Sequence, residues 1–223
     1  MFNYEEMKNK IILADCMDIM KDIPDKYFEL AIVDPPYGIG ENASRNKGDR
    51  PTKKWVTPNS IQYKTFDDSI IPDKNYFNEL FRISQNQIIW GGNYFTEYLK
   101  PSSGWIVWNK KSDIKERLSM CELAWSSFNI KCNRFDFLWA GFKKEIQEAR
   151  FHPTQKPVAL YRWLLQNYAK PGDKIIDTHS GSGSLACACH LEKFDFLAIE
   201  KDADYYKASV ERLDTLRSQG VLF

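Results

Sequence analysis

The tetrapeptide Asp34-Pro35-Pro36-Tyr37 follows a short apolar run and joins a carboxylate, two prolines and an aromatic ring. The prolines stiffen the chain and remove two backbone N–H donors, which leaves the Asp34 carboxylate and the Pro35 carbonyl as fixed acceptors. Two fixed acceptors suit a group with two N–H donors, namely an amino group, and Tyr37 offers a flat face for a planar ring. The candidate catalytic residues are therefore Asp34, Pro35, Pro36 and Tyr37.

This tetrapeptide resembles the signature of the amino-methyltransferases that act on DNA, which reads Asp, Asn or Ser followed by Pro-Pro-Tyr. The aspartate form is typical of adenine-N6 enzymes, and the serine form is commoner in cytosine-N4 enzymes. The resemblance implies transfer of a methyl group from S-adenosylmethionine to N6 of adenine in double-stranded DNA. The adenine would be flipped out of the duplex onto Tyr37, and Asp34 would stabilise the positive charge that develops on nitrogen.

A second element is the hexapeptide His152-Pro153-Thr154-Gln155-Lys156-Pro157. A threonine and a lysine before a helix-opening proline can hold an anion at a helix N-terminus, whereas the plain alternative is a helix cap at Thr154. The hexapeptide resembles the element that the same family places beside the methionine end of the cofactor. The resemblance implies that His152, Thr154 and Lys156 bind the cofactor.

A third element is the Gly/Ser-rich segment 177–184, which lies between a predicted strand and a predicted helix. Small residues let the backbone approach a ligand closely, although a plain tight turn is the alternative. Glu200 follows at a strand end, where an acid can accept hydrogen bonds from two ribose hydroxyls. His179 stands where many family members carry phenylalanine. The cofactor-binding candidates from this region are Asp177, His179, Gly181, Ser182, Gly183, Glu200 and Lys201.

A fourth element, Asp15-Cys16, follows the first predicted strand. The resemblance implies that Asp15 accepts a hydrogen bond from the cofactor adenine, with a helix N-cap as the alternative reading. Asp15, Cys16 and Asp34 complete the cofactor-binding candidates. Because the tetrapeptide comes first and the glycine loop last, the order resembles the permuted β group of these enzymes. The resemblance covers nearly the whole chain and is weakest over 40–64 and 110–150.

The segment 41–64 directly follows the tetrapeptide and is strongly basic. Six basic residues against two acidic ones give it a charge of +4, while the whole chain carries only +1. A charge excess beside a base-flipping pocket is what phosphate contact requires, although a solvated loop is the plain alternative. The candidate DNA-binding residues are Arg45, Lys47, Arg50, Lys53 and Lys54.

Short apolar runs alternate with helix-like stretches along the chain. The patterns predict strands over 10–14, 28–33, 87–90, 104–108, 174–176 and 194–199, helices over 73–84, 157–169 and 203–218, and a hairpin of 120–127 with 134–139. We therefore expect a single α/β domain over 1–223, with a Rossmann-like methyltransferase fold and a mostly parallel sheet covered by helices on both faces. Ligands bind at the carboxyl ends of such strands, where Asp15, Asp34, Asp177 and Glu200 stand.

Composition narrows the remaining classes. The sequence has no apolar run of membrane-spanning length and no secretion signal, and its five cysteines suggest no disulfide framework. We expect a cytoplasmic protein that does not bind membranes. We also expect no metal site, because Cys187 and Cys189 point apart on a helix and make a poor ligand pair. A homodimer is a further expectation. The open alternatives are a cytosine-N4 or RNA methyltransferase, a catalytically silent cofactor- or DNA-binding subunit, and a dehydrogenase.

Overall fold

The computed structural model describes residues 2–39, 71–111, 119–140, 143–144, 152 and 154–219. The basic segment 41–64, with all five candidate DNA-binding residues, lies outside the described residues, as does Pro153.

The chain builds one eight-stranded sheet in the order β1-β10-β9-β2-β3-β5-β4-β6. All of its neighbouring strands are parallel except β5, which runs antiparallel to both β3 and β4. This confirms the predicted mostly parallel sheet. The strands are β1 (Lys10–Leu13), β2 (Phe28–Val33), β3 (Ser84–Trp90), β4 (Ile106–Asn109), β5 (Cys121–Ser126), β6 (Asn133–Asp136), β9 (Lys174–Asp177) and β10 (Asp195–Glu200); β7 (Trp139–Ala140) and β8 (Lys143–Lys144) form a separate pair.

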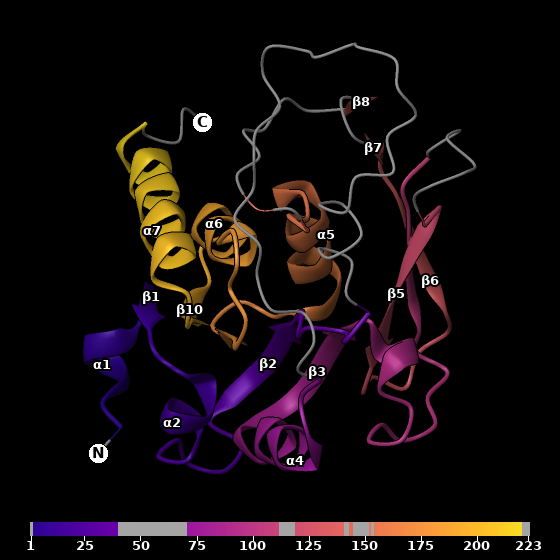
Figure 1. The fold of residues 1–223 in the computed structure, drawn as a ribbon, viewed down its shortest axis with the longest axis horizontal. Coiled ribbons are helices and arrows are strands. Elements are labelled where there is room, and N and C mark those ends of the chain that lie inside the picture. The colour runs from indigo at the N-terminus through magenta and orange to yellow at the C-terminus, as the bar shows by residue number, and fades with distance from the viewer. Residues whose placement is uncertain are drawn as a thin grey trace, which may run out of the picture.

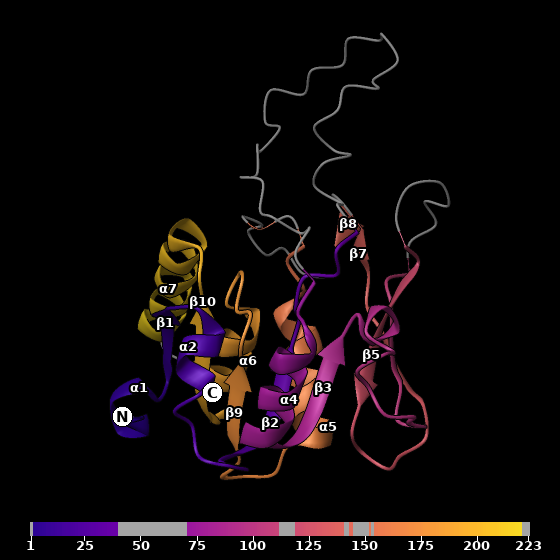
Figure 2. The same ribbon diagram turned by 60° about the horizontal axis from the view of Figure 1, so that its bottom comes forward.

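Helices cover both faces of the sheet (Figure 1, Figure 2). One face carries α5 (Val158–Tyr168), α6 (Ser184–Glu192) and α7 (Ala203–Ser218); the other carries α1 (Tyr4–Met7), α2 (Cys16–Met20) and α4 (Lys74–Ile83), while the short 3-10 helix η1 (Gly92–Tyr94) follows β3. Strand β2 contributes side chains to both cores, because successive side chains of a strand point to opposite faces. Leu30 and Ile32 join the first core, and Ala31 and Val33 join the second.

The topology fixes where a ligand can bind. Strands β9 and β2 are neighbours, and the helices that follow them, α6 and α4, lie on opposite faces of the sheet. This is the topological switch point of an open α/β sheet, where the crevice beyond the carboxyl ends binds ligands. Asp177 ends β9 and Asp34 directly follows β2, so both carboxylates stand at that crevice.

The predicted hairpin of 120–127 with 134–139 is wrong. Strand β4 lies between the two segments, pairing with β5 in antiparallel fashion and with β6 in parallel. Both hydrogen-bonding edges of β5 are satisfied by β3 and β4, and its last three residues are buried. A local apolar pattern specifies an extended backbone, but burial across the whole sheet selects the strand's neighbours.

The described residues contain neither a membrane-spanning helix nor a cluster of metal-binding side chains. No described helix combines the length and apolar character that crossing a membrane requires. The same residues contain no group of three or more His, Cys, Asp or Glu side chains placed to bind a metal ion. Cys187 and Cys189 are buried in α6 as part of the apolar core.

Candidate active site

The tetrapeptide and the hexapeptide meet at the carboxylate of Asp34. The Tyr37 hydroxyl donates a 2.5 Å hydrogen bond to Oδ1 of Asp34. The ammonium of Lys156, 122 residues further along the chain, pairs with Oδ2 of the same carboxylate. Two elements that are far apart in the sequence therefore form one site, and Lys156 contacts the candidate catalytic aspartate directly.

A second carboxylate, that of Glu122 on β5, also contacts Lys156. Its Oε2 lies 3.1 Å from the Lys156 Nζ, and its Oε1 lies 2.5 Å from the Nζ of Lys110. Burial alone would raise the pKa of Glu122, but the two lysines lower it to about 2. Burial likewise opposes the charge of Lys156, yet Asp34 and Glu122 raise its pKa. Glu122 and Lys156 are therefore both ionised at neutral pH.

Glu122 and Lys110 are absent from the candidates that the sequence supplies. The one available signal is an acidic residue inside an otherwise apolar strand. Such a residue belongs to no motif, and its partner Lys156 is distant in sequence.

The ring of Tyr37 is held in place by the segment after β3. Gly91 adopts φ +68°, and a Cβ there would lie 2.2 Å from Cε1 of Tyr37 and 2.6 Å from Cδ1 and Cζ. These three distances put the Cβ above the ring plane, so the backbone of Gly91 packs on a face of the ring. Tyr94 stacks against Tyr37 with 5.1 Å between ring centroids and is itself 48% exposed. Burial, then the charge of Asp34, raises the pKa of Tyr37, so its hydroxyl keeps the proton that it donates.

The glycine loop follows β9 and is tied to the end of β10. Gly181 and Gly183 have φ values of +51° and +70°, a region that favours glycine, and Gly183 is the N-cap of α6. Glu200 accepts hydrogen bonds from the backbone N–H groups of Gly181 at 2.7 Å and Asp202 at 2.8 Å. The pKa of Glu200 is raised above its ordinary value by burial, and the backbone donors offset only part of that rise. Glu200 thus fixes the loop at the carboxyl edge of the sheet.

Asp177 is a buried acid at the carboxyl end of β9. Its side chain accepts a hydrogen bond from the backbone N–H of His179 at 3.1 Å. Burial raises its pKa to about 8, and the nearby charges of Asp34 and Glu200 add to that effect. A buried carboxyl of this kind is suited to a cationic ligand group, which would favour its charged form.

His179 lies beside Asp177 as a neutral imidazole, because burial lowers its pKa to about 4. Its Nδ1 lies 2.9 Å from the Thr178 hydroxyl, which lies 2.7 Å from the hydroxyl of Tyr76 on α4. The rings of His179 and Tyr76 also meet edge to face. Through these contacts the polar ring of His179 has a hydrogen-bond partner, at a position where many members of the family named above carry phenylalanine.

The hexapeptide packs on the glycine loop. The buried ring of His152 lies 4.3 Å from that of Tyr205, and its Nδ1 accepts a hydrogen bond from the backbone N–H of Thr154 at 3.3 Å. The Ser184 hydroxyl, at the start of α6, donates to the Lys156 carbonyl at 2.8 Å. The N-cap of α5 is Pro157, without a side-chain cap, so Thr154 does not cap that helix.

The fourth element, Asp15-Cys16, lies at the same edge. Strand β1 pairs with β10 so that Leu13 stands opposite Glu200. Asp15 is the N-cap of α2, where its Oδ1 accepts from the backbone N–H of Met17 at 2.9 Å. Burial, and secondarily Asp15, raises the pKa of the Cys16 thiol to about 12, so this cysteine is not a thiolate. Lys201 is exposed just beyond β10.

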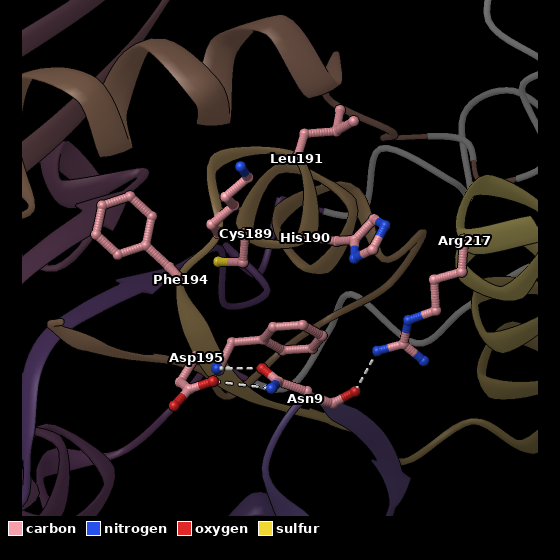
Figure 3. A pocket seen from close by; sticks show the side chains of 9 residues that line it. Asn9, Cys189, His190, Leu191, Phe194, Asp195 and Arg217 are labelled. Carbon is pink, nitrogen blue, oxygen red and sulfur yellow. Dashed lines mark hydrogen bonds between the residues drawn. The ribbon is translucent and has the colours of Figure 1, made fainter. Parts of the chain in front are cut away.

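A cavity of about 460 Å³ lies elsewhere, at the amino ends of β1 and β10 (Figure 3). Asn9 and Asp195 face each other across a 2.8 Å hydrogen bond, and Arg217 donates to the carbonyl of Asn9 at 2.5 Å. This cavity contains none of the predicted site residues and lies at the opposite edge from Asp34 and Asp177. We therefore assign the site to the carboxyl edge.

Comparison with known proteins finds one similar sequence and two similar folds among solved structures. The type II methyltransferase M.HinfI of Haemophilus influenzae is 22% identical over 260 residues, which covers 96% of this chain and 71% of that protein. The crystal structure of the M1.HpyAVI–SAM complex superposes with a TM-score of 0.57 at 19% identity, covering 91% of this chain and 98% of that one. The cytosine-N4-specific PvuII DNA methyltransferase superposes with a TM-score of 0.57 at 11% identity, covering 94% and 91%.

The pattern of the DNA methylase family, the N6 and N4 methyltransferases, matches residues 64–211. The match spans 148 of the 223 residues, from before α4 into α7. It confirms the resemblance that the tetrapeptide, the hexapeptide and the glycine loop indicate. The chain belongs to the DNA methylase family.

Proposed function

We propose that this protein is an S-adenosylmethionine-dependent DNA methyltransferase that methylates the N6 amino group of adenine. The observation that carries the proposal is the position of Asp34 beside Tyr37 and Asp177, at the switch point of the sheet. Family membership supports methyl transfer to DNA. The aspartate at the start of the tetrapeptide favours adenine.

In the proposed mechanism, the target base lies against Tyr37, whose ring is fixed by Gly91 and by its hydrogen bond to Asp34. The Asp34 carboxylate and the Pro35 carbonyl accept hydrogen bonds from the two amino N–H groups, which draws the nitrogen lone pair out of ring conjugation. S-adenosylmethionine, when bound, supplies a methyl group on a cationic sulfonium. Asp34 stabilises the positive charge that develops on the amino nitrogen, and positioning by the rigid tetrapeptide supplies further acceleration.

The residues of the crevice fit such a cofactor. S-adenosylmethionine carries an ammonium and a sulfonium, and the buried Asp177 is an acid that a cation would ionise. The positive φ values of Gly181 and Gly183 let the loop backbone approach a ligand closely. Glu200 accepts one backbone donor at each oxygen and keeps lone pairs for ribose hydroxyls. His152, Thr154, Asp15, Cys16, Ser182 and Lys201 remain proposed cofactor contacts.

The second candidate is cytosine-N4 methylation, because that amino group presents the same two donors. A structural neighbour with that specificity favours keeping this candidate. We propose that the basic segment 41–64 contacts DNA. That the protein forms a homodimer also remains a prediction.

One experiment separates the candidates. The purified protein is incubated with duplex DNA and labelled S-adenosylmethionine, and the DNA is digested to nucleosides for mass analysis, with an RNA duplex as a parallel substrate. We expect N6-methyldeoxyadenosine, and none when Asp34 is replaced by alanine. N4-methyldeoxycytidine would instead establish the second candidate, and label confined to RNA would overturn the DNA assignment.

A further inference from the structure

Lys156 is a buried cation between two carboxylates. Its side chain is 4% exposed, with Asp34 at one side and Glu122 Oε2 at 3.1 Å on the other. The rings of Trp90 and Tyr37 lie 5.4 and 5.8 Å from its Nζ. A buried ammonium needs a counter-ion at all times, because desolvation of an unpaired charge is costly.

The two carboxylates engage Lys156 differently. Asp34 accepts a hydrogen bond from its Nζ. Glu122 Oε2 is buried and close enough for an ion pair, yet within the described part of the chain it accepts no well-aligned hydrogen bond. Glu122 therefore keeps spare acceptor capacity directly beside the ammonium, while its other oxygen is paired with Lys110.

This arrangement conflicts with the reaction. Asp34 must accept a hydrogen bond from the target amino group and stabilise its developing positive charge, but the Lys156 ammonium at Oδ2 and the Tyr37 hydroxyl at Oδ1 already neutralise or share the negative charge of that carboxylate. An ammonium bound to that carboxylate also opposes a second positive charge on the amino nitrogen, since like charges repel strongly in a partly buried site. A counter-ion other than Asp34 is needed during methyl transfer.

We propose, on the basis of the function proposed above, that Glu122 is that counter-ion. When the amino group donates to Asp34, Lys156 turns its hydrogen bond to Glu122 Oε2 and remains protonated. No proton is transferred, and all three side chains keep their charges. Glu122 is thus a positioning residue that acts on the reaction through Lys156 and leaves Asp34 free for the substrate.

The test is a double-mutant cycle of Glu122→Gln and Lys156→Met. Glutamine keeps the size of Glu122 but removes its charge, so Lys156 stays on Asp34. We expect kcat for DNA methylation to fall about tenfold or more, while KM for DNA and the Kd for S-adenosylhomocysteine stay within about twofold. In the Lys156→Met background there is no ammonium to hold, so adding Glu122→Gln should change kcat by less than about twofold.

Two further variants serve as controls. Glu29→Gln alters another glutamate–lysine pair, Glu29 with Lys174 at 3.4 Å, at the amino end of β9 and away from Asp34, and should leave kcat unchanged. Glu122→Asp keeps the negative charge, but its side chain is one methylene shorter and places that charge further from Lys156. It should give a kcat between those of wild type and Glu122→Gln. It also serves as the test variant should Glu122→Gln not fold.

This inference alone would be overturned by an unchanged kcat in Glu122→Gln, or by effects of Glu122→Gln and Lys156→Met that multiply in the double variant. A kcat for Glu122→Asp no higher than that of a folded Glu122→Gln would also count against it. If Glu122→Gln does not fold, a wild-type kcat in Glu122→Asp overturns it. A folded wild-type protein that transfers no methyl group would overturn the proposed function as well.

Discussion

The backbone N–H of Gly181 donates a 2.7 Å hydrogen bond to Oε2 of Glu200, which joins the glycine loop to the carboxyl end of β10. The other oxygen of Glu200 accepts from the backbone of Asp202. Each carboxylate oxygen has two lone pairs, so Glu200 can anchor the loop and bind a ligand at once. Its contacts with the loop and its proposed role in cofactor binding can be separated by substitution.

Replacement of Glu200 by alanine should weaken binding of S-adenosylhomocysteine by about tenfold or more, because charge-assisted hydrogen bonds are worth about 1.5–3 kcal/mol each. Calorimetry measures the dissociation constant. Glu200→Gln retains an oxygen for Gly181 but loses the charge, so its loss should be smaller. An unchanged dissociation constant in Glu200→Ala would remove Glu200 from the cofactor site.

Replacement of Asp34 by alanine should lower the rate of methyl transfer by at least about a hundredfold, the scale for removing one preorganised charge-stabilising group. Cofactor affinity should change little, since Asp177 and Glu200 remain in place and Lys156 keeps Glu122 as counter-ion. Single-turnover assays and calorimetry measure the two quantities. Near-normal turnover in a folded Asp34→Ala protein would refute the proposed mechanism.

Asp177 should make the cofactor-free protein less stable as pH rises. Burial raises its pKa from 3.8 to about 8, so between these values the native state holds a proton that the unfolded chain releases. The stability it contributes is therefore complete below about pH 4 and is lost as pH rises through about 8. The slope cannot exceed about 1.4 kcal/mol per pH unit.

The matched variant is Asp177→Asn, which removes this titration but keeps the shape of the side chain. Urea unfolding of both proteins at pH 5 and pH 8 should show the variant gaining stability relative to wild type at the higher pH. Equal differences at the two pH values would show that Asp177 does not hold a proton in the native state.

Gly91→Ala should reduce both stability and turnover, because the added Cβ meets the ring of Tyr37 and the positive φ strains the backbone. Gly172→Ala is the matched control, since Gly172 has φ +92° but nothing within 4 Å of its Cβ position. Backbone strain alone is worth about 1–2 kcal/mol. We expect Gly172→Ala to show only that loss in urea unfolding, and Gly91→Ala to lose more and to slow methylation about tenfold. Equal turnover in the two variants would argue against a role for the packing of Gly91 on Tyr37.

Neutralising the basic segment should weaken DNA binding without altering cofactor affinity. The variant replaces Arg45, Lys47, Arg50, Lys53 and Lys54 by uncharged residues, which reduces the number of counterions that DNA binding releases. DNA affinity measured at several salt concentrations should therefore show a shallower salt dependence than wild type. Parallel lines for the two proteins would show that these residues do not contact phosphate.

Much of this protein follows from local sequence. The strand before Asp34 and the helix 203–218 are found at their predicted bounds, since side-chain periodicity and capping act over a few residues. The sequence also places four acids at strand ends, and the parallel sheet brings those ends to one edge. The tetrapeptide, the hexapeptide and the glycine loop also indicate the DNA methylase family, which the match over residues 64–211 confirms.

The tertiary structure alone decides which of these groups meet. Lys156 pairs with Asp34 and Glu122 because α5 packs in the same core as side chains of β2 and β3, and because β5 pairs with β3; no local pattern encodes these contacts. The neighbours of β5 are likewise chosen by burial across the sheet, which is why the predicted hairpin is wrong. The charge states of Asp177 and Glu122 also depend on the fold, because desolvation and nearby charges act through space and not along the chain.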